Sequence, residues 1–422
     1  MLPRSILLLL TLSFFYLVWG NWILSFTSLD EGRNMSAALH MLKSGDFIHP
    51  IYNCQPRFEK PPMLYWFVAF ISQVLGLGEF SARLISGLSA FGVALLIYLL
   101  TRDLYSEDTV ALRASLIFLT FPHVWVESRA VVPEMLNTFF SFLGLYAFLK
   151  GRFTWGWMAL SFAFLTKGPV GVVLALGVYI LWKRRLDFLN IKGIALFFLL
   201  GSSWYLLMFF QYGYEYLYRF FIYENVMRYT GDRSTHPAPL YYYPLVIAVG
   251  SLWYLPLYPK LLKGFRREWL PLALWFFFVL VFFSLAKNKL HHYILFAYPP
   301  LAILLAQVAK EKYIKGAIFL SLISLMSLTM LLHFYQQKRF VPKAWTVVKA
   351  YQGPVYFYKA EDSALVYYSE RCIKNLEDPT LARGLVITKE KYTQELTECK
   401  TILKGLEFDG KYVLLQCHEG LK

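Results

Sequence analysis

The chain has 422 residues, of which 57% are hydrophobic, 19% aromatic and only 16% charged. This composition excludes an ordinary soluble globular protein and indicates a polytopic α-helical membrane protein. The formal net charge of +15 does not indicate a nucleic-acid partner, because the basic residues form short clusters between apolar runs rather than one patch.

The first apolar run, Ser5 to Phe26, follows a lone Arg4 and is not followed by a small-residue cleavage site. We interpret it as a retained signal anchor that leaves the N-terminus in the cytoplasm. Met63–Gly76 is apolar but short, which predicts a juxtamembrane or re-entrant helix. The other apolar runs are long enough to cross a bilayer, and together with the signal anchor they bring the predicted count to about eleven spans. These runs are Phe80–Thr101, Thr109–Val126, Val132–Leu149, Phe153–Thr166, Gly168–Trp182, Leu189–Gln211, Leu240–Tyr258, Trp269–Ala286, Leu290–Ala309 and Tyr313–Phe334.

The loops between these spans differ in charge. Those placed in the cytoplasm are strongly basic, as at Lys183–Arg185 and Lys310–Lys315, and this agrees with the positive-inside rule. Those placed on the outer face carry charges of both signs, aromatic residues and prolines. Because ionisable groups at the ends of apolar spans are functional by default, we expect a site on the outer, periplasmic face.

The first outer loop, Ser28 to Trp66, is the most polar of them. Ser28 and Glu31 have the form of a capping box and Gly45 suits a helix end, so a helix is predicted between them with Asp30 and Arg33 on one face. Pro61-Pro62 can open the next helix, which leaves Glu59-Lys60 on extended chain before it. Ordinary ion pairs on a solvated loop are the competing interpretation of these charges.

The composition changes after the last apolar run. We therefore predict a transmembrane domain over residues 1–337 and a small soluble α/β domain over residues 338–422 on the outer face, near the lower size limit for an independent core. The predicted strands are Pro354–Tyr358, Ala364–Tyr368, Gly384–Thr388 and Tyr412–Gln416.

The four cysteines, Cys54, Cys372, Cys399 and Cys417, lack metal-ligand spacing. They allow a disulfide whose partners spacing does not identify.

The chemistry follows from the outer loops. The sequence contains no GxGxxG turn, P-loop or D-x-D pair, so no nucleotide cofactor is predicted. A phosphate-bearing lipid needs Lys or Arg at its head group, and transfer to a hydroxyl needs a carboxylate base. The outer face lacks a ready supply of nucleotide sugars, so a lipid-linked donor is the natural alternative. The candidate bases are Asp30, Glu59 and Glu134. The candidate phosphate-binding cations are Arg33, Lys60, Arg228 and Lys289.

Several motifs resemble one known family. Asp30-Glu31 with Arg33, Gly45–Phe47 and the run Glu59–Trp66 look like the first outer loop of GT-C membrane glycosyltransferases, in particular the lipid A aminoarabinose transferases, and are similar to protein O-mannosyltransferases. The resemblance covers about residues 1–310. Further matching motifs, in the same order along the chain, are Ser81–Leu84, Thr166–Pro169, Glu224-Asn225 with Arg228, Asn288–Leu290 with Tyr293, and Pro299-Pro300.

The resemblance implies an inverting enzyme that moves a sugar from polyprenyl (undecaprenyl) phosphate to an acceptor on the outer face of the inner membrane. A lipid A-type glycolipid is the expected acceptor, and a protein hydroxyl is the alternative. Asp30 would be the catalytic carboxylate and Lys60 with Arg33 would hold the donor phosphate. By the same resemblance, Arg228, Lys289 and Tyr293 are further candidates for that phosphate.

The chain departs from the family pattern at two positions. Glu134 stands where relatives often carry an aspartate, so its role as a second catalytic carboxylate is open. Asn225 stands where many relatives carry a histidine, which leaves a metal site open too. A divalent metal at Glu59 would find His236, His291 and His292 as available ligands.

Two other classes of protein compete with the enzyme. A transporter or flippase of lipid-linked sugars would also need a cationic pocket, but we find no repeat between the halves of the chain. A structural membrane subunit would leave the charges between Asp30 and Lys60 unexplained. The Lys167-Gly168-Pro169 motif is equally well interpreted as a tight turn between two short spans.

Overall fold

The computed structural model describes residues 4–27, 30–232 and 235–417. The chain divides into two compact units. The first contains Met1–Trp19, Phe58–Leu64 and Arg83–Leu325, and the second contains Gly20–Arg57, Tyr65–Ala82 and Met326–Lys422. The predicted first outer loop is therefore shared: most of it groups with the C-terminal residues, whereas Glu59 and Lys60 group with the first unit.

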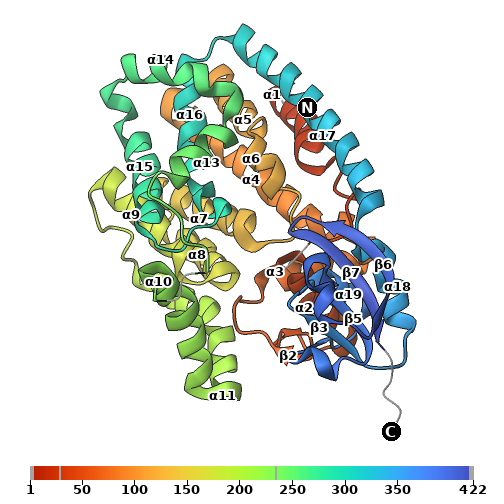
Figure 1. Cartoon of the computed structure of the whole chain (residues 1–422). Helices are drawn as coiled ribbons and strands as arrows, with labels where there is room; N and C mark the ends of the chain where they lie inside the picture. Colours follow the sequence, from red (N-terminus) through yellow and green to blue (C-terminus); the bar gives the residue numbers. More distant parts are fainter. Residues whose placement is uncertain (1–3, 28–29, 233–234, 418–422) are drawn as a thin grey trace. The chain divides into compact units, whose positions relative to one another are not determined.

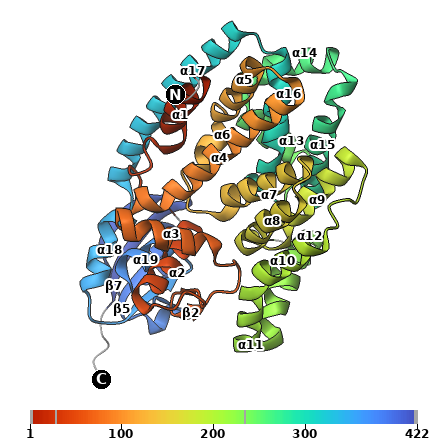
Figure 2. The ribbon, with the colours of Figure 1, turned by 180° about the vertical axis from the view of Figure 1, so that it is seen from behind.

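The first unit is helical (Figures 1 and 2). Helices α7, α8 and α9 pack against one another, α8 also packs against α10, and α15 contacts both α9 and α16. The elements are α1 (Arg4–Ser13), η1 (Phe14–Val18), α4 (Glu79–Tyr105), α5 (Asp108–Leu119), α6 (Pro122–Glu127), α7 (Pro133–Leu149), α8 (Phe153–Lys167), α9 (Pro169–Lys183), α10 (Ile191–Gly201), α11 (Ser203–Leu217), η2 (Tyr218–Val226), α12 (Met227–Thr230), α13 (Tyr242–Gly250), η3 (Leu252–Leu257), α14 (Tyr258–Lys263), η4 (Arg267–Trp269), α15 (Leu270–Leu285), η5 (His291–Ala297), α16 (Tyr298–Val308) and α17 (Glu311–Lys338), which continues into the second unit.

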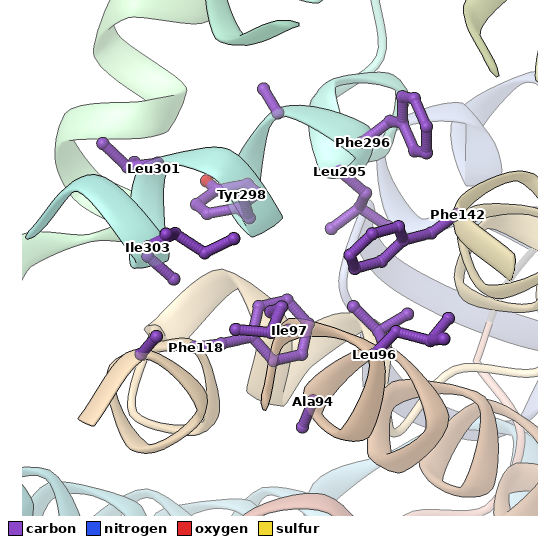
Figure 3. Packing of buried hydrophobic residues seen from close by; sticks show 14 of the residues in the cluster. Ala94, Leu96, Ile97, Phe118, Phe142, Leu295, Phe296, Tyr298, Leu301 and Ile303 are labelled. Atoms are coloured by element: carbon purple, nitrogen blue, oxygen red, sulfur yellow. The ribbon is translucent and has the colours of Figure 1, made fainter. Parts of the chain in front are cut away.

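The core of the first unit forms around α16. Figure 3 shows Tyr298, Leu301 and Ile303 of this helix facing Ile97 of α4 and Phe118 of α5. Buried apolar residues occupy every side of α16, and a helix that is apolar all round is a buried helix. The element η5, which immediately precedes α16, is therefore anchored by a rigid helix.

Several predicted spans are broken helices. Three described helices are long and apolar enough to cross a membrane, and two pairs bent at a short break raise that number to five. The predicted span Thr109–Val126 is divided into α5 and α6, where Pro122 at the first turn of α6 starts a new helix. The predicted span Leu240–Tyr258 bends by 96° after Gly250. The count of eleven spans stays a prediction.

The second unit combines short helices with a five-stranded sheet of order β4-β3-β5-β7-β6 (Figure 1). Strand β3 is parallel to β4 and β5, whereas β7 is antiparallel to β5 and β6. Its elements are α2 (Asp30–Ser44), β1 (Ile51–Tyr52), β2 (Gln55–Pro56), α3 (Met63–Leu75), α18 (Val341–Ala350), β3 (Val355–Tyr358), α19 (Ser363–Ser369), β4 (Lys374–Asn375), η6 (Pro379–Leu381), β5 (Gly384–Lys389), η7 (Glu390–Glu395), β6 (Cys399–Glu407) and β7 (Gly410–Cys417).

The predicted small α/β fold of the C-terminal residues is confirmed in three of its four predicted strands, which correspond to β3, β5 and β7. The fourth prediction, a strand at Ala364–Tyr368, is wrong, because these residues form α19. The Asp362 side chain caps this helix by accepting a hydrogen bond from the Leu365 amide at 3.0 Å. A short apolar run buried on nearly all sides has no period that separates helix from strand.

Helix α2 is present as predicted and packs against α19. Ser28, its predicted cap, lies outside the described residues. The Glu31 carboxylate accepts hydrogen bonds from the backbone amide and hydroxyl of Thr27, at 2.8 and 2.9 Å. A Cβ at Gly32 would lie only 2.2 Å from the backbone of Ser363, so a glycine permits the close approach of α2 to α19.

Two disulfides, Cys54–Cys372 and Cys399–Cys417, lie within the second unit. The first joins residues 318 positions apart. The serine variant of both Cys54 and Cys372 should therefore lose about 2–4 kcal/mol of unfolding free energy, because the unfolded chain is no longer constrained. Thermal unfolding measures the loss, and peptide mapping without reduction should recover the two cysteines on one linked species. Separate peptides in that map would contradict the pairing.

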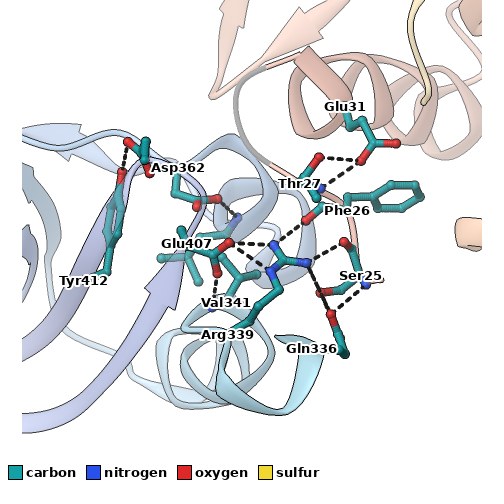
Figure 4. Close-up of polar contacts among 12 residues, drawn as sticks. Ser25, Phe26, Thr27, Glu31, Gln336, Arg339, Val341, Asp362, Glu407 and Tyr412 are labelled. Atoms are coloured by element: carbon teal, nitrogen blue, oxygen red, sulfur yellow. Dashed lines mark hydrogen bonds and ion pairs between the residues drawn. The ribbon is translucent and has the colours of Figure 1, made fainter. Parts of the chain in front are cut away.

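Asp362 introduces a pH dependence into the second unit (Figure 4). Burial, together with the nearby charge of Glu407, raises the pKa of its carboxyl from 3.8 to about 7. One of its oxygens, Oδ2, is buried without a hydrogen-bond partner among the described residues. The folded state therefore holds this proton more tightly than the unfolded state, so the contribution of Asp362 to stability is fully present below about pH 3.8 and is lost as the pH rises through about 7.

The Asp362→Asn variant should remove this dependence. Asparagine keeps the oxygen that caps α19 and carries no ionisable proton. We expect the variant to have a higher melting temperature than the wild type at pH 8, and we expect this difference in melting temperature to become smaller as the pH falls toward 4. An unchanged slope of melting temperature against pH would show that Asp362 is not the titrating group.

Candidate functional site

A cavity of about 410 Å³ opens within the first unit. Part of its wall is polar and comes from four separate stretches of the chain, represented by Glu59-Lys60, by Lys167, by Glu224-Asn225 with Arg228, and by Asn288 with Tyr293. Most of the wall is apolar, and its apolar residues include Val170, Val173, Phe220, Phe221, Phe282 and Phe283. The cavity can thus receive an amphiphile that has an anionic head and a hydrocarbon chain.

Lys167 is the best-defined cation of the cavity. It ends α8, and Gly168, at φ +73°, turns the chain directly into α9. Its ammonium lies 3.0 Å from Glu134 Oε1 and 4.2 Å from the centroid of the Tyr293 ring. The Lys167-Gly168-Pro169 motif is therefore both a tight turn and part of the site, because the turn places the Lys167 side chain at the cavity. Lys167 was not among the residues predicted for the phosphate.

Glu134 lies behind Lys167 and is not among the residues that line the cavity. It occupies the first turn of α7, and its side chain is only 3% exposed. His292 Nε2 also lies 3.3 Å from Glu134 Oε1. Two partners on one carboxylate oxygen make Glu134 a group that positions Lys167 and His292.

Glu59 and Lys60 line the cavity from the loop before α3. Pro61-Pro62 precede this helix, which starts at Met63, as the sequence predicted to within two residues. Lys60 lies within electrostatic range of both Glu134 and Lys167. Two lysines thus share one negative neighbour, which leaves a net positive charge for an anionic ligand such as a phosphate to balance.

Arg228, on α12, also lines the cavity. Its Nη1 lies 3.2 Å from Glu224 Oε2, one helical turn earlier. Asn225, which stands where relatives have histidine, donates a hydrogen bond to the backbone oxygen of Phe220 at 2.6 Å. Of the predicted phosphate ligands, the structure therefore brings Lys60, Arg228 and Tyr293 to one cavity.

Lys289 is placed differently. It is buried, it is not among the lining residues, and its ammonium donates to the backbone oxygens of Ala238 and Ala286. The neighbouring Asn288 lines the cavity and accepts a hydrogen bond from the His236 amide at 2.8 Å. Lys289 thus has the surroundings of a residue that holds the loop in shape.

Asp30 and Arg33 belong to the second unit, on the first two turns of α2. Arg33 Nη2 lies 2.7 Å from Glu361 Oε1, which also accepts a hydrogen bond from the Tyr52 hydroxyl at 3.1 Å. Burial lowers the pKa of Arg33, but the hydrogen bond and charge of Glu361 outweigh it and raise the pKa above its usual range. Glu361 is a partner of Arg33 that sequence spacing could not reveal.

One group of three residues in the described ranges could hold a metal ion: His123, Glu127 and His291. Glu59, the predicted metal ligand, is not a member of it. Of its members, His291 is among the ligands predicted from the sequence and His123 and Glu127 are not. The spacing of His123 and Glu127, four residues apart on a helix, is the sequence signal that could have found them.

Comparisons with known proteins agree with this architecture. Residues 5–216 match the family model of dolichyl-phosphate-mannose-protein mannosyltransferases. An uncharacterized protein of Aquifex aeolicus is 51% identical over 98% of this chain and the whole of its own length. An undecaprenyl phosphate-alpha-4-amino-4-deoxy-L-arabinose arabinosyl transferase of Pseudomonas fluorescens is 31% identical over 74% of this chain. The chain spans 60% of that relative's length.

Solved structures show the same fold. ArnT from Cupriavidus metallidurans, crystallised with undecaprenyl phosphate, superposes with a TM-score of 0.80 over 97% of both chains at 18% identity. The Archaeoglobus fulgidus oligosaccharyltransferase covers 90% of this chain with a TM-score of 0.56. The predicted GT-C fold is thus confirmed, and the chain belongs to the dolichyl-phosphate-mannose-protein mannosyltransferase family of GT-C membrane glycosyltransferases.

Proposed function

We propose that the chain transfers a sugar from a polyprenyl phosphate to an acceptor at the outer face of the inner membrane. The observation that carries this proposal is the cavity, in which Lys60, Lys167 and Arg228 face a largely apolar wall. A lipid phosphate needs both parts, since lysine and arginine bind the head group and the prenyl chain needs apolar surface. The fold shared with an undecaprenyl phosphate-binding protein supports the same donor class.

The proposed reaction inverts the anomeric carbon. An acceptor hydroxyl attacks this carbon while its bond to the phosphate oxygen breaks, and the hydroxyl proton passes to a carboxylate base, the role that the family resemblance implies for Asp30. Negative charge then grows on the departing lipid phosphate, where Lys60 and Arg228 stabilise it. Tyr293 supports Lys167 through its ring, and Glu134 positions Lys167 from behind. Lys289 acts outside this set, through its hydrogen bonds to the backbone, and Arg33, which is paired with Glu361, stays a proposed ligand of the donor phosphate.

Relatives that cover most of this chain and have a named activity include aminoarabinose transferases. We therefore assign the acceptor to the glycolipid class, with a lipid A-type molecule as the first candidate. The family model, which is named for protein mannosylation, makes a protein hydroxyl the alternative. Transfer assays with purified lipid A and with membrane proteins as acceptors separate the two.

The proposed orientation places the N-terminus in the cytoplasm and both the site and the C-terminal residues in the periplasm. The basic loops between predicted spans support it through the positive-inside rule. The two disulfides of the second unit support it as well, because such bonds persist in oxidising compartments. Labelling of an introduced cysteine at Lys263 and at Lys391 from either side of the membrane should report opposite faces.

Native mass spectrometry of the purified protein tests the donor. Wild type should carry a polyprenyl phosphate, with or without its sugar, and the Lys60→Ala/Arg228→Ala variant should lose it. Lys263→Ala removes an exposed lysine of the same unit and should retain the lipid. Asp30→Asn should retain the lipid but fail to transfer, which separates binding from catalysis. Equal lipid in wild type and the double variant would overturn the phosphate assignment.

A further inference from the structure

His123, Glu127 and His291 form a compact cluster that the transfer reaction does not use. His123 and Glu127 lie four residues apart on α6, and their side chains are 7% and 2% exposed. His291 begins η5 and is half-exposed. The cluster thus joins two elements that are far apart in the sequence and leaves one side open.

The three atoms that face one another have the spacing of a metal-ligand set. His123 Nε2 lies 3.2 Å from His291 Nδ1 and 3.6 Å from Glu127 Oε1, and His291 Nδ1 lies 3.1 Å from the same oxygen. A tetrahedral zinc ion with bonds of about 2.0–2.2 Å places neighbouring ligand atoms roughly 3.3–3.6 Å apart. The three sides, at 3.1, 3.2 and 3.6 Å, lie within about 0.2 Å of this range, so the triangle is close in size to one face of a zinc tetrahedron.

The surroundings also prepare His123 as a ligand. Its other ring nitrogen, Nδ1, lies 2.8 Å from the hydroxyl of the buried Tyr298. This hydroxyl can accept a proton from Nδ1, and the contact then leaves the Nε2 lone pair for a metal ion. A Cβ at Gly250 would lie 2.1 Å from the Tyr298 oxygen and 2.8 Å from His123 Cβ, so the glycine makes room for this contact.

All three facing atoms can act as metal ligands together. His123 Nε2, His291 Nδ1 and the Glu127 carboxylate oxygen each have a lone pair to give when they are unprotonated. A divalent cation accepts lone pairs from all three atoms together and neutralises the buried carboxylate.

We propose that His123, Glu127 and His291 bind a divalent transition metal of the zinc class, with a water or an external ligand in the fourth position. Two imidazoles and one carboxylate suit zinc rather than magnesium or calcium, which prefer oxygen ligands. The ion would fix η5 to α6. The same η5 carries His292, which contacts Glu134, and Tyr293, which lines the cavity, so the metal sets the position of one cavity wall.

The test uses the purified full chain, stripped with a chelator and titrated with Zn²⁺ by calorimetry and with Co²⁺ by visible absorption. Wild type should bind close to one equimolar ion, show the intense bands of tetrahedral cobalt and melt at a higher temperature with metal. His291→Ala and Glu127→Gln should lose all three responses. His333→Ala, which removes an exposed histidine of α17, should behave as wild type.

Tyr298→Phe distinguishes a built site from adventitious binding. It leaves the three ligands in place and removes the group that orients His123, so the affinity for zinc should fall about 10–100-fold. His291→Ala removes a half-exposed side chain, so the metal-free variant should melt close to the metal-free wild type. Wild type that binds no zinc, or that binds it as tightly as His291→Ala does, would overturn the proposal. Neither result depends on the sugar-transfer activity.

Discussion

Replacing Lys60 by alanine is expected to slow sugar transfer by about 10²–10³-fold, the usual effect of removing one group that stabilises developing negative charge. Lys60 lines the cavity and lies within electrostatic range of Glu134 and Lys167. Its loss removes positive charge where the lipid phosphate would depart. The rate of transfer from a purified polyprenyl-phosphate sugar at saturating donor measures the effect.

The Lys60→Ala experiment needs controls for folding and for the chemical role. Lys60→Arg keeps the charge and should recover part of the rate, because arginine also binds phosphate. Lys263→Ala, on the exposed surface of α14, should transfer at the wild-type rate. A Lys60→Ala protein that transfers as fast as wild type would remove Lys60 from the site.

Replacing Arg339 by alanine is expected to destabilise the second unit by about 3–5 kcal/mol, because a buried charge loses its partner. Both side chains of the Arg339–Glu407 pair are fully buried, and their closest atoms, Nη2 and Oε2, are 2.8 Å apart. Figure 4 shows the guanidinium at the centre of a network in which it also donates to the backbone oxygen of Phe26 at 2.8 Å. Glu407 in turn accepts from the Val341 amide at 2.9 Å.

Thermal unfolding of Arg339→Ala, Glu407→Ala and the double variant measures this effect. The double variant should lose less than the sum of the single losses, because it leaves neither charge unpaired. The exposed pair Lys404–Glu390, at 2.9 Å, is the matched control, and Lys404→Ala should cost at most about 1 kcal/mol. A loss for Arg339→Ala no larger than that for Lys404→Ala would mean that water enters the network.

Several features of this protein could be predicted because they are local in the chain. The apolar runs predicted helices, and Pro61-Pro62 predicted the start of α3. The order of the polar motifs between Asp30 and Tyr293 identified the family, which the comparisons confirmed. Locality also explains the error at Ala364–Tyr368, since a five-residue apolar run suits a buried strand and a buried helix equally.

By itself the sequence determined the membrane class, the GT-C family and several polar residues of the cavity wall, because composition, charge patterning and motif order are properties of the chain. Only the tertiary structure decided which distant groups meet. Arg33 finds Glu361 across 328 residues and His123 finds His291 across 168, and spacing in the sequence carries no such distance. The tertiary structure likewise joined Cys54 to Cys372 and placed Glu134 behind Lys167, because burial and packing, not local propensity, select these partners.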